Sequence, residues 1–205
     1  YPDQSLHQVR QAYELADSQS NPSTLGFALV FTAYIHQLRR EDALCEGKAE
    51  AVMRLSREKD IADNLLWASC ARGWAIAKRG RPEEGLGQLR ETTSICKSVG
   101  AEIDLTHLLA LLAEAYMCAR QFAAALATVD EALGMTARNR DCYYDAELQR
   151  LRGELLLLNG ATEAEAERCF QQAREIARQQ SAKSWELRAE TSLARLWQQQ
   201  GKLTE

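Results

Sequence analysis

The residue types that could carry out catalysis or bind a metal are scattered along this 205-residue chain. Its three histidines, His7, His36 and His107, form no H-E-x-x-H pattern, and no cysteine stands near them at ligand spacing. The sequence has no G-x-S-x-G turn and no G-x-x-x-x-G-K-[ST] phosphate-binding loop. We therefore predict no catalytic residue, no metal site and no cofactor, and expect that this chain is not an enzyme.

The six cysteines also give no sign of chemistry. They are 22 to 27 residues apart and never form a C-x-x-C pair. Free cysteine is among the most buried residue types, and a helical chain of this length needs no disulfides. We expect reduced thiols, packed one per helix, in a cytoplasmic protein.

Binding is the chemistry that remains, and its candidates recur at a spacing of seven residues. Phe27 and Tyr34 have this spacing, and Trp67 and Trp74 repeat it 40 residues later. Residues seven apart share one face of a helix. In the later repeats, charged residues occupy the equivalent helix positions. The candidate binding residues are Phe27, Tyr34, Trp67, Trp74, His107, Glu114, Arg150, Glu154, Arg188 and Arg195.

Two interpretations are open for each end of this stripe. The four aromatic rings predict a pocket that anchors apolar side chains of a partner or stacks on a planar ligand, or they are the larger fillers that long helices need. At the charged end, Glu147 and Arg188 occupy equivalent positions on adjacent helices, as do Glu154 and Arg195. These four residues either recognise a partner or form a neutral ladder of ion pairs.

The composition predicts that helices alone position these residues. Of the 94 apolar residues, 60 are Ala or Leu and 11 are Val or Ile, and the chain has 3 Pro and 11 Gly. Strong helix formers therefore supply the apolar content, and β-branched residues do not. We predict an all-α fold.

A repeat of 40 residues organises the chain. A small residue recurs at Ala33, Gly73, Ala113, Gly153 and, after one inserted residue, Ala194. A second small column runs through Ser5, Cys45, Gly85, Ala125 and Ala166, and a third column, expected to be a buried stripe, runs through Leu15, Leu55, Ile95, Met135 and Ile176. Between the two small columns, Arg40, Gly80, Arg120, Gly160 and Gly201 form a turn column, where Gly suits the left-handed residue that ends a helix.

Each repeat is therefore expected to be a pair of antiparallel helices, and stacked pairs form a right-handed helical-hairpin solenoid of roughly ten helices. We expect a single solenoid over residues 1–205. Pro82 fits the first position of a helix, and Thr162 with Glu165 forms a T-x-x-E capping box that accommodates the inserted residue. The expected elements are a lone helix at 3–19, repeats at 22–58, 61–98, 103–138 and 142–179, and a lone helix at 183–200.

An array that begins and ends within a repeat is expected to be a piece of a longer protein. Solenoid ends need polar caps, and the first and last helices here carry apolar residues such as Leu6 and Leu193. We therefore expect end-to-end dimers of this fragment.

The charge and hydropathy of the chain suggest which partners it lacks. A net charge of −4, without a basic stripe, predicts no nucleic-acid partner. The longest apolar stretch, residues 108–113, is far shorter than the roughly 20 residues that cross a bilayer, so we expect no membrane partner.

The columns resemble the tetratricopeptide repeat (TPR), which has a small residue at position 8 of the first helix, followed by a small residue, a bulky apolar residue and an Ala at positions 20, 24 and 27. Gly73, Gly85 and Leu89 match that pattern, whereas the 40-residue period exceeds the 34 residues of the TPR. Stretches such as "RGWAIAKRG" at 72–80 and "AKSWELRAETSLARLWQQQGK" at 182–202 resemble the C-terminal repeat region of large bacterial adenylate or guanylate cyclases and AAA-ATPase regulators.

This resemblance implies a non-enzymatic module of a larger bacterial signalling protein, whose concave groove binds a protein, a peptide or another domain of its own chain. The alternative is a small-molecule sensor that controls an ATPase or cyclase elsewhere in the parent chain. An open groove favours the first function, and a closed pocket around Trp67 and Trp74 favours the second.

Overall fold

The structure, a computed structural model, describes residues 2–19, 21–60, 64–100, 105–139 and 142–202. All regular secondary structure in these ranges is α-helical. The chain divides into two compact units, residues 1–100 and 101–205, and each unit is described by itself below. The continuity of one array across both units stays a prediction.

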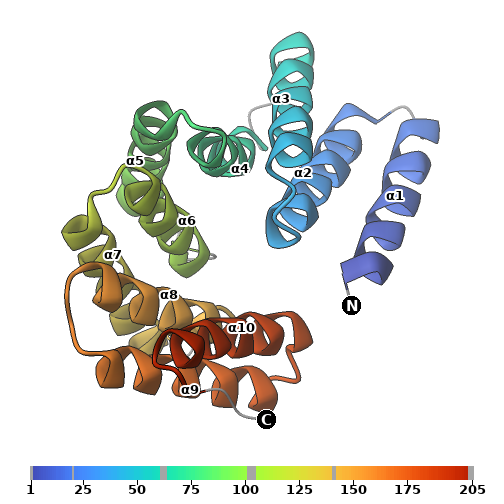
Figure 1. Cartoon of the computed structure of the whole chain (residues 1–205). Helices are drawn as coiled ribbons and strands as arrows, with labels where there is room; N and C mark the ends of the chain where they lie inside the picture. The colour runs from blue at the N-terminus through green and yellow to red at the C-terminus, as the bar shows by residue number, and fades with distance from the viewer. Residues whose placement is uncertain (1, 20, 61–63, 101–104, 140–141, 203–205) are drawn as a thin grey trace. The chain divides into compact units, whose positions relative to one another are not determined.

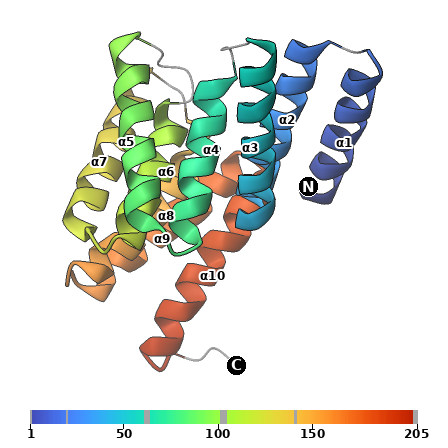
Figure 2. The same ribbon diagram turned by 90° about the horizontal axis from the view of Figure 1, so that it is seen from above.

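The first unit contains five helices among its described residues (Figure 1). They are α1 (Pro2–Ser18), α2 (Pro22–Leu38), α3 (Asp42–Lys59), α4 (Leu65–Lys78) and α5 (Pro82–Ser98). Each helix packs against the next one along the chain (Figure 2), and α2 also contacts α4. The first helices of successive pairs therefore lie next to each other, as a helical-hairpin array requires.

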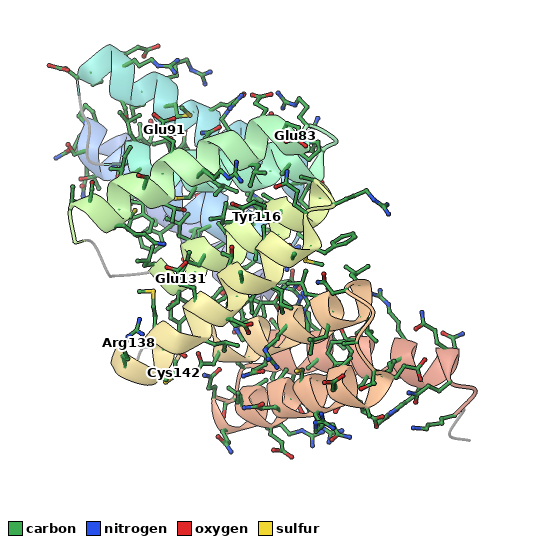
Figure 3. The ribbon with its side chains drawn as sticks, turned by 90° about the vertical axis from the view of Figure 1, so that its left-hand side faces the viewer. Glu83, Glu91, Tyr116, Glu131, Arg138 and Cys142 are labelled. Carbon is green, nitrogen blue, oxygen red and sulfur yellow. The ribbon has the colours of Figure 1, made fainter. Side chains whose placement is uncertain are left out.

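The second unit repeats this arrangement. Its described helices are α6 (Leu105–Cys118), α7 (Phe122–Asn139), α8 (Asp145–Leu158), α9 (Glu163–Gln179) and α10 (Lys183–Gln199). Again each helix packs on the next, and α8 contacts both α6 and α10. In both units the second helix of a pair presents charged side chains to solvent. Examples are Glu83 and Glu91 on α5 and Glu131 and Arg138 on α7 (Figure 3).

Local signals in the sequence explain where the helices begin and end. The outer boundaries of the expected lone helices and repeats lie within four residues of the observed helix ends, although the expected starts at residues 61 and 103 lie outside the described residues. Pro82 occupies the first turn of α5. The hydroxyl of Thr162 accepts a hydrogen bond from the Glu165 amide, and the Glu165 carboxylate accepts one from the Thr162 amide at 3.0 Å. The capping box is thus present, as predicted.

The turn column adopts the left-handed conformation at all five positions. The φ angles are 63° at Arg40, 85° at Gly80, 58° at Arg120, 80° at Gly160 and 68° at Gly201. A left-handed residue lets the chain reverse directly after each first helix and begin the second.

The small columns lie where paired helices approach most closely. A Cβ atom at Gly85 would be 2.3 Å from the Gly73 carbonyl oxygen, and one at Gly153 would be 2.5 Å from the Phe170 ring. Ala113 and Ala125 are fully buried, whereas Ala194 is exposed. The columns therefore set the distance between the two helices of a pair.

The third apolar column is not the continuous buried stripe that we expected. Met135 is buried, but Leu15 and Ile95 are largely exposed. With about 3.6 residues per turn, a position ten residues after the small column lies about 80° away from it around the helix axis. This column therefore follows the edge of the buried face and not its centre.

The cysteines follow the prediction with two exceptions. Cys45, Cys70, Cys96 and Cys169 are buried free thiols, Cys118 is partly buried, and Cys142 is exposed. Cys142 precedes α8 and so does not pack within a helix pair. In the described part of the chain, no helix is long and apolar enough to cross a membrane.

Candidate binding site

The candidate binding residues lie on the first helices of the pairs. Those of the aromatic end belong to α2 and α4 in the first unit, and those of the charged end belong to α6, α8 and α10 in the second unit. The structure therefore presents two separate sites, one in each unit.

The first site is a pocket of about 830 Å³ between α1, α2 and α4, which we call the aromatic pocket. Phe27 and Phe31 of α2 line it, with a ring-centroid distance of 5.0 Å and an edge-to-face orientation. Trp67 of α4 lines it as well, and Leu15 contributes from α1. Phe27 is 55% exposed and Phe31 is 46% exposed, so these rings face solvent in an open hollow.

The polar residues of the aromatic pocket carry no formal charge. They are Gln8, Gln19, Ser23, Thr24 and Asn64. Amide and hydroxyl side chains can both donate and accept hydrogen bonds, which suits the backbone groups of a bound chain. The pocket therefore combines exposed aromatic rings with neutral polar side chains.

Trp74 and Tyr34 do not line this pocket, although they were predicted to share it with Phe27 and Trp67. Trp74 is only 1% exposed, and the Arg40 guanidinium lies 5.5 Å from the centroid of its ring. Trp74 belongs to the core, which corrects the expectation that its ring is open for binding. Seven residues keep two side chains on one face but separate them by about 10 Å along the axis, so one can be covered while the other is open.

The second site is a set of four charged side chains and one hydroxyl between α8 and α10, which we call the charge cluster: Glu147, Arg150, Glu154, Arg188 and Ser192. Arg150 donates two hydrogen bonds to the Glu147 carboxylate, from Nε at 2.9 Å and from Nη2 at 2.7 Å. It also binds Glu154, whose carboxylate accepts a hydrogen bond from the Ser192 hydroxyl at 3.2 Å. The Glu147 side chain is fully buried.

The carboxylates determine the charge state of Arg150. Burial alone would lower the pKa of its guanidinium, but the charge and hydrogen bonds of Glu147, followed by the charges of Glu154 and Glu114, raise it above the ordinary value. Arg150 therefore stays protonated inside the unit and holds the two glutamates of α8 in fixed positions.

One rung of the predicted ion-pair ladder forms and the other does not. Arg188 Nη2 lies 2.6 Å from Glu147 Oε1, which joins α10 to α8. Arg195 has no ion pair or hydrogen bond among the described residues, because Arg150 and Ser192 bind Glu154 in its place. Arg195 is exposed.

We expected a partner to contact His107 and Glu114 directly. Both side chains are buried, so such a contact cannot form. The His107 ring packs at 4.7 Å from Tyr144, and Tyr144 packs at 5.1 Å from Trp185. These buried positions correct the prediction that His107 and Glu114 bind a partner. Among the described residues, no group of three or more His, Cys, Asp or Glu side chains is arranged to hold a metal ion.

Several residues of the two sites were missed in the sequence. Phe31 lies one helical turn after Phe27, and this spacing could have identified it. Ser192 carries no such signal, because a hydroxyl between two helices is not distinguished by its spacing.

Comparison with known proteins identifies the fold. No protein-family model matches the chain, and no curated protein matches it. Among solved structures, PlcR from Bacillus thuringiensis in complex with the peptide PapR7 and DNA has a TM-score of 0.74 and 16% identity, over 92% of this chain and 72% of that chain. The apo form of PlcR has a TM-score of 0.66 and 12% identity, over 90% of this chain and 72% of that chain.

The PlcR complex corrects the prediction that nucleic acid is excluded as a partner. That complex contains DNA, so a chain that includes this fold occurs in a protein–DNA assembly. The net charge of these 205 residues indicates only how strongly these residues themselves attract a polyanion. It does not indicate how strongly a longer protein that contains such a fold attracts one.

A second group of similar structures comes from Podosopora anserina. A protein described as a kinesin light chain with nearly identical TPR-like repeats has a TM-score of 0.61 and 18% identity, over 89% of this chain and 90% of that chain. At these identities the likeness concerns the fold alone. The all-α fold class is thereby confirmed, and the chain has the fold of the TPR-like helical repeat proteins.

Proposed function

We propose that the chain is a non-enzymatic interaction module, which binds an apolar segment of a protein or peptide in the aromatic pocket. The exposed rings of Phe27 and Phe31 over a hollow of about 830 Å³ are the observation that carries this proposal. Aromatic side chains in a concave site bury a large area when a partner covers them, and they dominate the energetics of many interfaces.

The chemistry of the pocket defines the partner. Because none of its lining residues is charged, a charged side chain in the pocket would lose water without gaining a counter-ion. The segment that fits presents one or two large apolar side chains, and its backbone amides pair with the side-chain amides of Gln8 and Gln19. The open position of the rings favours such a partner over a small molecule enclosed at this site.

We further propose that the module belongs to a larger bacterial regulatory protein and conveys the bound state of the pocket to its other domains. The sequence likeness to the repeat regions of bacterial cyclases and AAA-ATPase regulators supports this context. The PlcR structure, in which a TPR-like fold occurs together with a peptide and DNA, is a further supporting observation.

A library of displayed random heptapeptides tests the proposal. We expect selection on the wild-type chain to enrich peptides that carry large apolar residues and few charges. Because hot-spot side chains typically contribute about 2 kcal/mol or more, Phe27→Ala should weaken a selected peptide about thirtyfold. The melting temperature should change little, since the ring is half-exposed.

Leu187→Ala is the matched control, because Leu187 is a large apolar residue that is 69% exposed in the other unit. This variant should bind the selected peptides as the wild type does. Enriched peptides that bind Phe27→Ala with unchanged affinity would contradict the proposal, as would the absence of any enrichment.

A further inference from the structure

The guanidinium of Arg195, which has no ion pair within the described part of the chain, lies at a second pocket, which belongs to the second unit. This pocket has a volume of about 350 Å³ and is formed by α6, α8, α9 and α10. Its apolar wall consists of Met117, Leu157, Leu158, Phe170 and Leu196. Its polar lining consists of Glu154, Ser192, Arg195 and Gln199.

We propose that this pocket binds a free α-amino acid with an apolar side chain. Glu154 receives the ammonium group, Arg195 receives the carboxylate, and the apolar wall receives the side chain. This site is independent of the peptide site proposed above, because the two pockets share no residue and lie in different units.

The geometry of Glu154 supports the ammonium position. Both of its hydrogen bonds within the protein, from Arg150 and from Ser192, reach the same oxygen, Oε1. Oε2 has no partner among the described residues, and the side chain is 29% exposed. A carboxylate that is fixed on one oxygen and open on the other is a preorganised acceptor for a cationic donor.

Arg195 supplies the opposite charge on the facing helix. Glu154 and Arg195 lie at equivalent positions of α8 and α10 and line the same pocket, but they form no ion pair with each other. A planar guanidinium binds a carboxylate through two parallel hydrogen bonds. A ligand that carries both an ammonium group and a carboxylate can pair with Glu154 and Arg195 at the same time.

The size of the pocket limits the ligand to about one residue. A volume of 350 Å³ is at the lower end of the range for small-molecule sites, about 300 to 1,000 Å³. The aliphatic and thioether groups of the wall suit side chains such as those of leucine, methionine and phenylalanine.

Calorimetric titration of the full chain tests the proposal with L-leucine, L-methionine and L-phenylalanine. We expect saturable binding of at least one of them. Leucinamide, which lacks the carboxylate, and 4-methylpentanoate, which lacks the ammonium group, should each bind at least about tenfold more weakly than leucine, because each loses a charge-assisted interaction.

Two variants assign the ionic contacts. Arg195→Gln should weaken the amino acid at least about tenfold and remove the preference over leucinamide. Arg168→Gln is the matched control, since Arg168 is an exposed arginine of α9 that does not line the pocket, and it should bind as the wild type does.

The outcomes decide the proposal. It is overturned if none of the three amino acids binds at about 10 mM, a concentration at which even a millimolar site is mostly filled. Equal binding of leucine and leucinamide would overturn the role of Arg195. A short peptide that ends in leucine and binds more tightly than free leucine would overturn the assignment to a free amino acid. The peptide test at Phe27 does not depend on any of these results.

Discussion

The charge cluster leads to a sharp prediction for Arg150. Replacing Arg150 by methionine removes two hydrogen bonds to Glu147, at 2.9 and 2.7 Å, and the contact with Glu154. Methionine fills much of the same volume, so the change tests charge and hydrogen bonding more than packing. The fully buried Glu147 carboxylate then still has Arg188, at 2.6 Å, as a cationic partner.

Removal of one partner from a buried ion pair costs about 3 to 5 kcal/mol. Because Arg188 still compensates Glu147 and because Glu154 reaches solvent, we expect the lower limit, about 3 kcal/mol of unfolding free energy. In a protein of this length 1 kcal/mol corresponds to about 2 to 4 °C, so the melting temperature should fall by about 6 to 12 °C. Thermal unfolding followed by far-UV circular dichroism, with urea titration for the free energy, measures this loss.

Two further variants make the interpretation specific. The double variant Glu147→Leu with Arg150→Met should be more stable than Arg150→Met alone, because it removes the buried carboxylate together with its partner. Arg152→Met is the control: Arg152 pairs with Asp130 at 2.8 Å near the surface, and this change should cost less than about 1 kcal/mol. If Arg150→Met costs no more than Arg152→Met, the cluster does not stabilise the second unit as described.

Three other predictions concern the core, the turns and a helix cap. Trp74→Ala should destabilise the chain by about 3 to 5 kcal/mol, measured by urea unfolding, because it empties a buried site; a loss below about 1 kcal/mol would show that the ring is not in the core. Gly160→Ala should destabilise by about 1 kcal/mol, since a Cβ there meets open space and only the left-handed backbone opposes it; Ser181→Gly, at φ 55°, should have the opposite sign in the same assay. Thr162→Ala should remove the cap of α9, and its cost should depend on pH: hydrogen bonds from Thr162 lower the pKa of Glu165, so the stabilisation is present above the ordinary carboxyl pKa and is lost as the pH falls through the lowered value. Unfolding of both proteins across the acid range tests this dependence, and a cost that is independent of pH would refute it.

The fold was predictable because backbone signals recur at each repeat. The turn column identified the left-handed positions, including Arg40 and Arg120, where the residue itself gives no hint. Periodicity averages over five copies, so a single unfavourable residue does not obscure the helix boundary. The capping box at Thr162 was readable for a different reason: its chemistry is local, within four residues of the chain.

The candidate sites were less predictable because they depend on which neighbour covers a side chain. Trp67 and Trp74 have the same residue type and share a helical face, yet one lines a pocket and the other is buried. The sequence allowed two equal rungs between α8 and α10, but it could not show that Arg150 takes Glu154 from Arg195. Both outcomes depend on distances between helices. The spacing of residues along the chain does not determine these distances.

The contact between α4 and α5 limits how the repeats of this chain can be exchanged. A Cβ atom at Gly85 would lie 2.3 Å from the Gly73 carbonyl oxygen, and one at Gly73 would lie 2.8 Å from Leu89 Cγ, so neither position has room for a methyl group. Their counterparts in α6 and α7 are Ala113 and Ala125, which require a wider spacing between the paired helices. If a single helix were exchanged between these two pairs, the new pair would therefore clash or leave a gap. Repeats of this protein can be exchanged only as whole helix pairs.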